Sequence, residues 1–207
     1  MKDAQKILLK DEFQRAFAAA KVAAPKGVFE ALVDRYSEPH RAFHTLQHVA
    51  ECLAALKSVR SAPPAAAIAL WFQDAIFDPQ RNDNEERSAA WAKTVLGKGP
   101  FADQVEKMIL ATKAGAATID VYERMVADID LAVLAASEPR FSEHEAQLRQ
   151  EYFWLDDVAY KEHHFKLLRS YSDRVYIFGS PEFRSLEIKA RKNIERSINA
   201  LITAKKK

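Results

Sequence analysis

Five residues whose side chains can ligate a metal ion lie in or beside apolar segments: His44, His48, Asp74, Asp128 and Asp130. His44 and His48 are four residues apart, and side chains at that spacing share one face of a helix. A carboxylate in an apolar helix is costly to desolvate unless a cation or hydrogen-bond donors compensate its charge. Imidazoles and carboxylates are common ligands of divalent metals. Together these residues predict a cation site that faces the interior.

The buried aspartates also allow a second interpretation, because an arginine can compensate a buried carboxylate as well. The candidate partners in the sequence are Arg41, Arg149 and Arg191. Both the cation site and the ion pairs are compatible with the spacing.

The remaining histidines and the single cysteine are weaker candidates. His163 and His164 are adjacent, so on a helix their side chains diverge and cannot chelate one ion, and we expect them at the surface. His144 lies near a predicted helix start, and we expect it to be solvated. Cys52 follows His48 by four residues. A Cys–His pair is typical of nucleophilic thiols, but we interpret Cys52 as a buried structural residue.

The composition excludes several classes of protein. The chain has 207 residues, 48% of them hydrophobic, which is enough for one sizeable core. Its five glycines lack the spacing of a dinucleotide-binding loop or a P-loop. A net charge of +2 predicts no nucleic-acid or membrane partner, and the lysine run 205–207 is interpreted as a solvated helix end. One cysteine excludes a disulfide within the chain, and without a signal-like segment we expect a cytoplasmic protein.

Apolar residues recur at helical spacing, and no segment shows the alternation of a strand. We therefore expect an all-α protein: a single helical bundle of nine or ten helices that forms one domain over residues 1–207. Helices are expected from His44 to Val59, from residue 63 through Phe77 with Asp74 inside it, and over 118–136. The sequence does not indicate the oligomeric state.

Seven stretches, in order along the chain, resemble one known family. They are YSEPHRAFHTLQHV (36–49), AIALWFQDAIFD (67–78), DNEERSA (83–89), ILATK (109–113), ADIDLAVL (127–134), LRQEY (148–152) and ARKNI (190–194). A histidine, then an apolar helix ending in His-Asp, then an aspartate on a later helix is the pattern of the HD superfamily of metal-dependent phosphohydrolases. The chain resembles its bacterial subfamily of predicted phosphohydrolases, with the core motif region over 36–160. The resemblance implies an HD-domain-like helical fold and a divalent metal ion as cofactor.

The same resemblance implies a metal site formed by His48, Asp74 and Asp128, with Asp130 as the alternative to Asp128. Gln73 stands at the position of a further ligand. In the enzyme so implied, Asp74 acts catalytically, and Lys113 or Arg41 stabilises the charge of a phosphate. The residues that it places at or near the pocket are His44, Asn84, Glu85, Ser88, Asp130, Arg149 and Glu151.

Two positions depart from the family pattern. Gln73 replaces the histidine of the His-Asp pair, and Gly115 stands close to where a histidine follows the Thr-Lys pair. A glutamine carbonyl is a weaker ligand for transition metals than imidazole and suits harder cations. Glycine offers no ligand at all.

Three functions follow as hypotheses. The first is a metal-dependent phosphohydrolase of a small phosphorylated molecule, with nucleotides among the candidate substrates. The second is a non-catalytic HD-like protein that binds a ligand or a partner, which Gln73 and Gly115 favour. The third is a structural helical domain whose buried acids form ion pairs.

Overall fold

The computed structural model describes residues 3–204, which form ten α-helices and two short 3₁₀ helices joined by turns and loops, and no strand occurs there. The expected all-α class is confirmed. In chain order the elements are α1 (Asp3–Ala19), α2 (Val28–Arg35), α3 (Leu46–Leu56), α4 (Pro64–Phe72), α5 (Asn84–Leu96), α6 (Pro100–Leu110), α7 (Val121–Asp130), η1 (Leu131–Ala135), α8 (Glu138–Glu151), α9 (Asp157–Ser172), η2 (Pro181–Leu186) and α10 (Glu187–Ala204). The lysine run 205–207 lies outside the described residues.

The α4 helix lies within the hydrophobic core. Pro64 occupies its first turn, where a missing N–H is tolerated because it would have no partner within the helix. Seven of its nine residues are buried. The ring of Trp71 makes edge contacts with Phe13 at 5.4 Å and Phe29 at 6.0 Å between centroids. This aromatic cluster packs α1 and α2 against α4 and holds the end of α4 in place.

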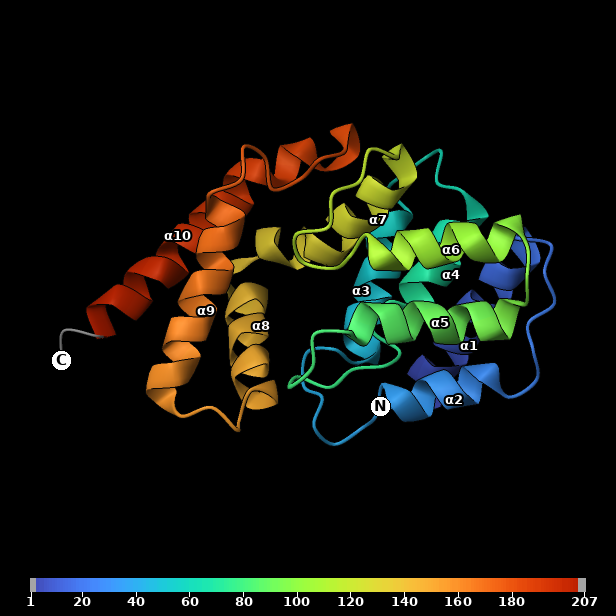
Figure 1. The fold of residues 1–207 in the computed structure, drawn as a ribbon, viewed down its shortest axis with the longest axis horizontal. Coiled ribbons are helices and arrows are strands. Elements are labelled where there is room, and N and C mark those ends of the chain that lie inside the picture. Colours follow the sequence, from blue (N-terminus) through green and yellow to red (C-terminus); the bar gives the residue numbers. More distant parts are fainter. Residues whose placement is uncertain (1–2, 205–207) are drawn as a thin grey trace.

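Figure 1 shows the helices in two groups with α7 and η1 between them. In the first group α5 and α6 run side by side, and α6 covers α4. In the second group α9 packs on α10, and η1 contacts both α8 and α10. The α7–η1 segment therefore joins the two groups. None of the described helices combines the length and apolar character that crossing a bilayer requires.

Two helices end earlier than the sequence predicts. The α4 helix ends at Phe72, so Gln73 and Asp74 follow it instead of lying within it. The carbonyl oxygens beyond that point bond to a buried guanidinium, which replaces the helical hydrogen bonds. The helix expected over 118–136 changes to 3₁₀ geometry after Asp130. Asp74 and Asp130 thus stand at helix ends, where their side chains can face a neighbouring element.

The α3 helix begins later than expected. The Thr45 hydroxyl caps it by accepting a hydrogen bond from the backbone N–H of Gln47. His44 therefore precedes the helix, and it does not share a helical face with His48, contrary to the spacing argument. The two histidines take different partners as a result.

Candidate metal-binding site

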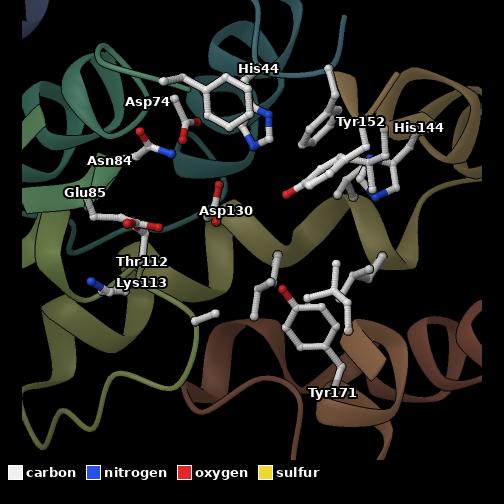
Figure 2. Close-up of a pocket in the computed structure, with 18 of the residues that line it drawn as sticks. His44, Asp74, Asn84, Glu85, Thr112, Lys113, Asp130, His144, Tyr152 and Tyr171 are labelled. Carbon is white, nitrogen blue, oxygen red and sulfur yellow. The ribbon is translucent and has the colours of Figure 1, made fainter. Parts of the chain in front are cut away.

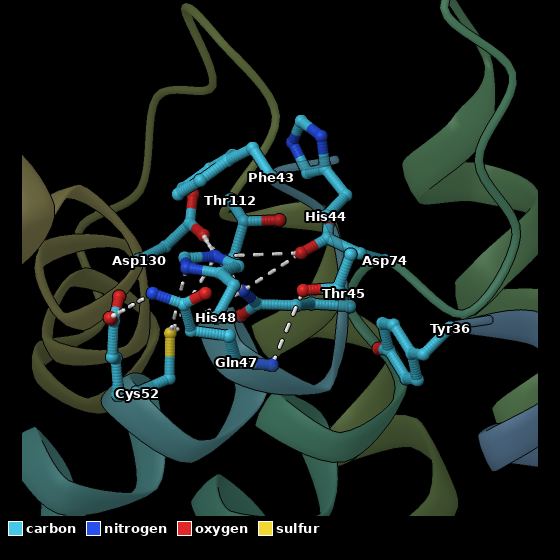
Figure 3. Close-up of polar contacts among 12 residues, drawn as sticks. Tyr36, Phe43, His44, Thr45, Gln47, His48, Cys52, Asp74, Thr112 and Asp130 are labelled. Atoms are coloured by element: carbon cyan, nitrogen blue, oxygen red, sulfur yellow. Dashed lines mark hydrogen bonds and ion pairs between the residues drawn. The ribbon is translucent and has the colours of Figure 1, made fainter. Parts of the chain in front are cut away.

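Potential metal ligands from α3, the end of α4 and the end of α7 meet at one point (Figure 3). The Nε2 atom of His48 lies 2.9 Å from Oδ1 of Asp130 and 3.6 Å from Oδ2 of Asp74. The sulfur of Cys52 lies 3.7 Å from the same nitrogen. His48, Cys52 and Asp130 are close enough together to hold a metal ion. We use the name ligand cluster for the following five residues: His48, Cys52, Asp74, Asp130 and Gln73.

The side-chain amide of Gln73 lies in the middle of the ligand cluster. Its Nε2 atom is 2.7 Å from Oδ1 of Asp130, 3.3 Å from Oδ2 of Asp74, 3.3 Å from Nε2 of His48 and 3.9 Å from the sulfur of Cys52. A metal ion would take the same position among these donors. The amide donates its two N–H groups to the two carboxylates, which need positive charge or donors nearby. Its Oε1 atom is buried without a hydrogen-bond partner among the described residues.

The ligand cluster carries opposite charges at short range. Burial lowers the pKa of His48, but the sulfur of Cys52 and the hydrogen bond with Asp130 outweigh burial and raise it well above its ordinary value. The imidazole is thus paired as a cation with carboxylates when no ion is bound. The donor set of imidazole, carboxylates and thiol fits a divalent transition metal, provided that the Gln73 amide turns or moves aside.

Glu151 holds the segment before α3 in place. Its carboxylate has no exposed side-chain surface, and Oε1 accepts hydrogen bonds from the backbone N–H groups of Ala42, Phe43 and His44. Oε2 is paired with Nδ1 of His44 at 2.7 Å. Burial raises the pKa of Glu151, but His44 and the backbone donors outweigh it and lower this pKa to about 2. Burial lowers the pKa of His44, but Glu151 outweighs burial and raises it.

Arg41 links the same segment to the turn that carries Asp74. Its side chain is fully buried, and its guanidinium donates to the carbonyl oxygens of His44, Asp74 and Ala75 and to the Glu38 carboxylate. With these donors engaged and the side chain enclosed, Arg41 has no surface toward a substrate. The family resemblance implied that Arg41 meets a phosphate. In the structure it positions the Asp74 backbone instead.

A cavity of about 390 Å³ opens beside the ligand cluster (Figure 2). One wall is polar and carries Asp74, Asp130, Glu85 and Lys113. Burial raises the pKa of Glu85, and the negative charge of Asp74 adds to that effect. An apolar wall is formed by leucines and aromatic rings: Phe43, Phe77, Leu131, Leu134, Leu148, Tyr152, Leu167, Leu168 and Tyr171. We call this space the main cavity.

Other predicted site residues lie at the edge of the main cavity or outside it. The Asn84 amide lines the cavity and pairs with both backbone groups of Asp78, while Ser88 is fully buried and pairs with both backbone groups of Ile76. Lys113 lines the cavity, but its ammonium group bonds to Glu86 and to a backbone carbonyl. These residues hold the 76–84 loop against α5.

Two predicted positions are separated from the ligand cluster. Arg149 pairs with Asp157 and with the backbone carbonyls of Tyr152 and Leu155 in the turn between α8 and α9. Gly115 has φ +83°, and a Cβ built there would meet no atom within 4 Å. A histidine at this position would have room but would need a strained left-handed backbone.

Asp128 and Asp130 have different surroundings. The Asp128 carboxylate is buried and accepts hydrogen bonds from the backbone N–H groups of Gly179 and Ser180 and from the Ser180 hydroxyl. Burial raises its pKa, and these donors oppose the rise. Asp130 faces His48. The structure therefore brings Asp130 into the ligand cluster and leaves Asp128 to hold the segment before η2.

The arginine partners considered for the buried aspartates are engaged elsewhere. Arg149 pairs with Asp157 and Arg191 with Glu187, and among the described residues no ion pair joins an arginine to Asp74 or Asp130. The ion-pair interpretation thus does not describe these two carboxylates.

Sequence reasoning missed several residues of this region. His144 is buried, not solvated, and its Nδ1 atom has no hydrogen-bond partner among the described residues. Burial lowers its pKa well below the ordinary value, so it is neutral. His164 is also buried, with Nε2 2.8 Å from Oε1 of Glu145, whereas His163 is exposed as expected. His144 is three residues after Phe141, and that apolar spacing was the available signal for burial.

The hydroxyl groups of Tyr152 and Tyr171 point into the main cavity (Figure 2). Burial raises the pKa of Tyr171 to about 12, so its hydroxyl stays protonated. Nothing in the spacing of these two aromatic residues identifies them as cavity walls. Comparison with protein-family models, curated proteins and solved structures finds no significant match for this chain.

Proposed function

We propose that the protein hydrolyses a small phosphorylated molecule with a divalent cation held by His48, Asp74 and Asp130. The observation that carries this proposal is the convergence of three ligand side chains, from α3, the turn after α4 and the end of α7, beside a cavity of ligand size. At such a position a divalent cation supplies positive charge against phosphoryl oxygens and makes a nearby water more acidic.

The charge of the main cavity supports the need for a cation. Asp74, Asp130 and Glu85 face the cavity, and the ammonium group of Lys113 is engaged by Glu86 at the cavity edge. A phosphate would meet carboxylates at this wall, and like charges repel strongly where water is partly excluded. A bound cation would reverse the sign of the interaction.

His44 is suited to meet the substrate from the polar wall. Its ring lines the main cavity, and Nδ1 is paired with Glu151, which leaves Nε2 for the cavity side. Glu151 raises the pKa of His44, which favours the doubly protonated imidazolium. His44 then donates a proton toward the leaving oxygen, while Glu151 and Arg41 are positioning residues.

The apolar wall suits the part of the substrate that is not phosphate. Tyr152 and Tyr171 offer ring surface and hydroxyl groups, and the unpartnered Nδ1 atom of His144 lies in the same wall. A cavity with one polar and one apolar wall favours a phosphomonoester with a hydrophobic or aromatic body over inorganic phosphate.

The test is phosphate release by protein that has been stripped of metal and then supplied with Mn²⁺ or Zn²⁺. Nucleoside monophosphates and sugar phosphates serve as probes. We expect turnover that depends on the cation and falls at least about tenfold in His48→Ala, since even outer partners of a metal ligand matter that much. Gln47→Ala, on the same helix, is the matched control and should keep its activity.

A second function is favoured by the position of the Gln73 amide. Its two N–H groups donate to the two carboxylates and so take the place of the cation that would otherwise compensate their charge. The alternative is thus a protein that binds a phosphorylated ligand or a partner without turnover. A wild type that is silent with every cation, beside an active Gln73→His variant, would establish this alternative. Silence in both proteins would refute the hydrolase.

A further inference from the structure

Cys52 faces the ligand cluster from the side opposite Asp74. It follows His48 by four residues on α3, and its sulfur is 3.7 and 3.8 Å from the two ring nitrogens of His48. The same sulfur is 3.9 Å from the Nε2 atom of Gln73 at the centre of the cluster. Cys52 is buried, so the sulfur is held near these polar atoms by the packing of α3. Figure 3 shows it below the His48 ring.

Two of the three separations from the His48 nitrogen match those of a four-ligand metal site. Bonds of about 2.0–2.3 Å in a tetrahedral site place ligand atoms roughly 3.3–3.8 Å apart. Nε2 of His48 is 3.7 Å from the Cys52 sulfur and 3.6 Å from Asp74, whereas its 2.9 Å hydrogen bond to Asp130 would have to lengthen when an ion enters. A thiol therefore stands where it can supply the ligand that an amide at position 73 supplies poorly.

We propose that Cys52 is a ligand of the cation site and makes the site selective for thiophilic divalent cations such as Zn²⁺ over Mg²⁺ or Mn²⁺. The inference rests on the cation site of the proposed function and adds a ligand to it. Thiolates select zinc, whereas carboxylates alone suit magnesium and manganese. On binding, the sulfur forms a bond to the cation and its proton leaves to solvent.

A second cavity gives this side of the ligand cluster its own approach. It has a volume of about 300 Å³ and is lined by His48, Cys52 and Asp130, whereas Asp74 lines only the main cavity. Arg140 and Glu51 line it as well and form a two-point ion pair, with Nε–Oε1 at 2.7 Å and Nη2–Oε2 at 3.0 Å. An ion can reach the sulfur there without crossing the space proposed for the substrate.

The Gln73 amide does not block this arrangement. Its nitrogen is 2.7 Å from Asp130 and would have to leave the centre when a cation enters. A half-turn of the amide brings Oε1, which lacks a partner, to face the cation, and an amide oxygen is a ligand that a cation accepts.

Cobalt spectroscopy tests the proposal on the intact protein. Co²⁺ is added to metal-free wild type, and the near-ultraviolet region is examined for thiolate-to-cobalt charge transfer. Cys52 is the single cysteine of the chain, so such a band assigns the ligand without any variant. We expect one equivalent of Co²⁺ to give the band. Cys52→Ser should lose it while keeping visible Co²⁺ absorption from the remaining ligands.

The competing outcomes are distinct. Co²⁺ absorption in the visible without a charge-transfer band in wild type would overturn the role of Cys52 and leave the proposed cation site intact. No Co²⁺ binding by wild type would overturn both. Competition of Zn²⁺ against Mn²⁺ gives a second readout, and the preference for Zn²⁺ should fall at least about tenfold in Cys52→Ser. An unchanged preference refutes the selectivity.

Discussion

The Gln73 side chain occupies the position where four ligand residues of three kinds converge. With the amide nitrogen inward, it satisfies two carboxylates and leaves its own oxygen without a partner. An imidazole at position 73 would present a lone pair to the same point. The chemistry of the site therefore depends on one side chain, while the surrounding residues stay in place.

Gln73→His should raise the affinity for Zn²⁺ or Mn²⁺ at least about tenfold, because imidazole is a stronger ligand than an amide oxygen. Titration calorimetry of metal-free protein measures the change. Gln80→His adds a histidine on the exposed part of the following loop and is the matched control. Equal gains in the two variants would mean that position 73 does not face the ion.

Asp128 and Asp130 should respond to amide substitution in opposite ways. Asp128→Asn replaces one of the two carboxylate oxygens that together accept three hydrogen bonds from Gly179 and Ser180, and we expect a loss of about 3 kcal/mol in unfolding free energy. Cation affinity should not change. Asp130→Asn should abolish cation binding while changing stability by less than about 1 kcal/mol, since Asp130 is partly exposed. Urea unfolding measures the stability of both variants, and calorimetry measures their cation affinity.

The candidate ligands could be named from the sequence, but their partners could not. Asp128 and Asp130 stand two residues apart on one apolar segment, and the choice depends on where residues 179–180 fold back. Likewise, His144 was expected in solvent because it lies near a helix start, and nothing in the spacing of the two cavity tyrosines marked them as cavity walls. These residues line a cavity because the two helix groups are spaced apart there, and that spacing is a tertiary property that a local sequence pattern does not encode.

At the scale of elements, the segment 42–44 has no helical hydrogen bonds of its own and depends on Glu151 of α8. Sequence periodicity predicted the helices well because an apolar stripe is a local property. The ends of α3 and α4 were not predictable in that way. Glu151 of α8 bonds to the segment before α3, and Arg41 in that segment bonds to the turn after α4. Both helix ends therefore depend on contacts between distant parts of the chain.

Glu151→Gln should therefore destabilise the protein in a pH-dependent way. The pKa of Glu151 is lowered from 4.5 to about 2, so its charge stabilises the fold above pH 4.5 and ceases to do so as the pH falls toward 2. A difference of this size corresponds to about 3 kcal/mol of unfolding free energy at pH 7. Urea unfolding should show this gap at pH 7 and a smaller gap at pH 3.

The control for Glu151 is Glu143→Gln, which alters a half-exposed carboxylate on the same helix. Its effect should stay within about 0.5 kcal/mol at both pH values. A gap for Glu151→Gln that is constant with pH would contradict the charge-based explanation and leave only the loss of packing.

At the scale of the molecule, the main cavity lies between the two helix groups, since its walls come from the turn after α4, from α5 and from the end of α7 on one side, and from α8 and α9 on the other. Asp130 stands at the junction. A cation bound by α3, the end of α4 and the end of α7 would link the first group to the connecting segment, and it would stabilise the folded state as a whole.

Zn²⁺ should raise the melting temperature of the wild type. At about 100 times its dissociation constant a ligand adds about 2.7 kcal/mol. For a protein of this size that corresponds to a rise of roughly 5–10 °C, at about 2–4 °C per kcal/mol. Circular dichroism melts with Zn²⁺ or with a chelator measure it. Asp128→Asn should keep the rise and Asp130→Asn should lose it; an equal rise in both would place the ion elsewhere.

The arrangement around Gln73 has a consequence for the history of the protein. Glutamine and histidine codons differ only in their third base, so a single base change converts the amide into an imidazole. Because His48, Asp74 and Asp130 already surround that position, no second substitution is needed to complete the shell. The chain therefore stands one mutational step from a histidine-rich metal centre, and random mutagenesis under selection for metal-dependent phosphatase activity would reach it directly.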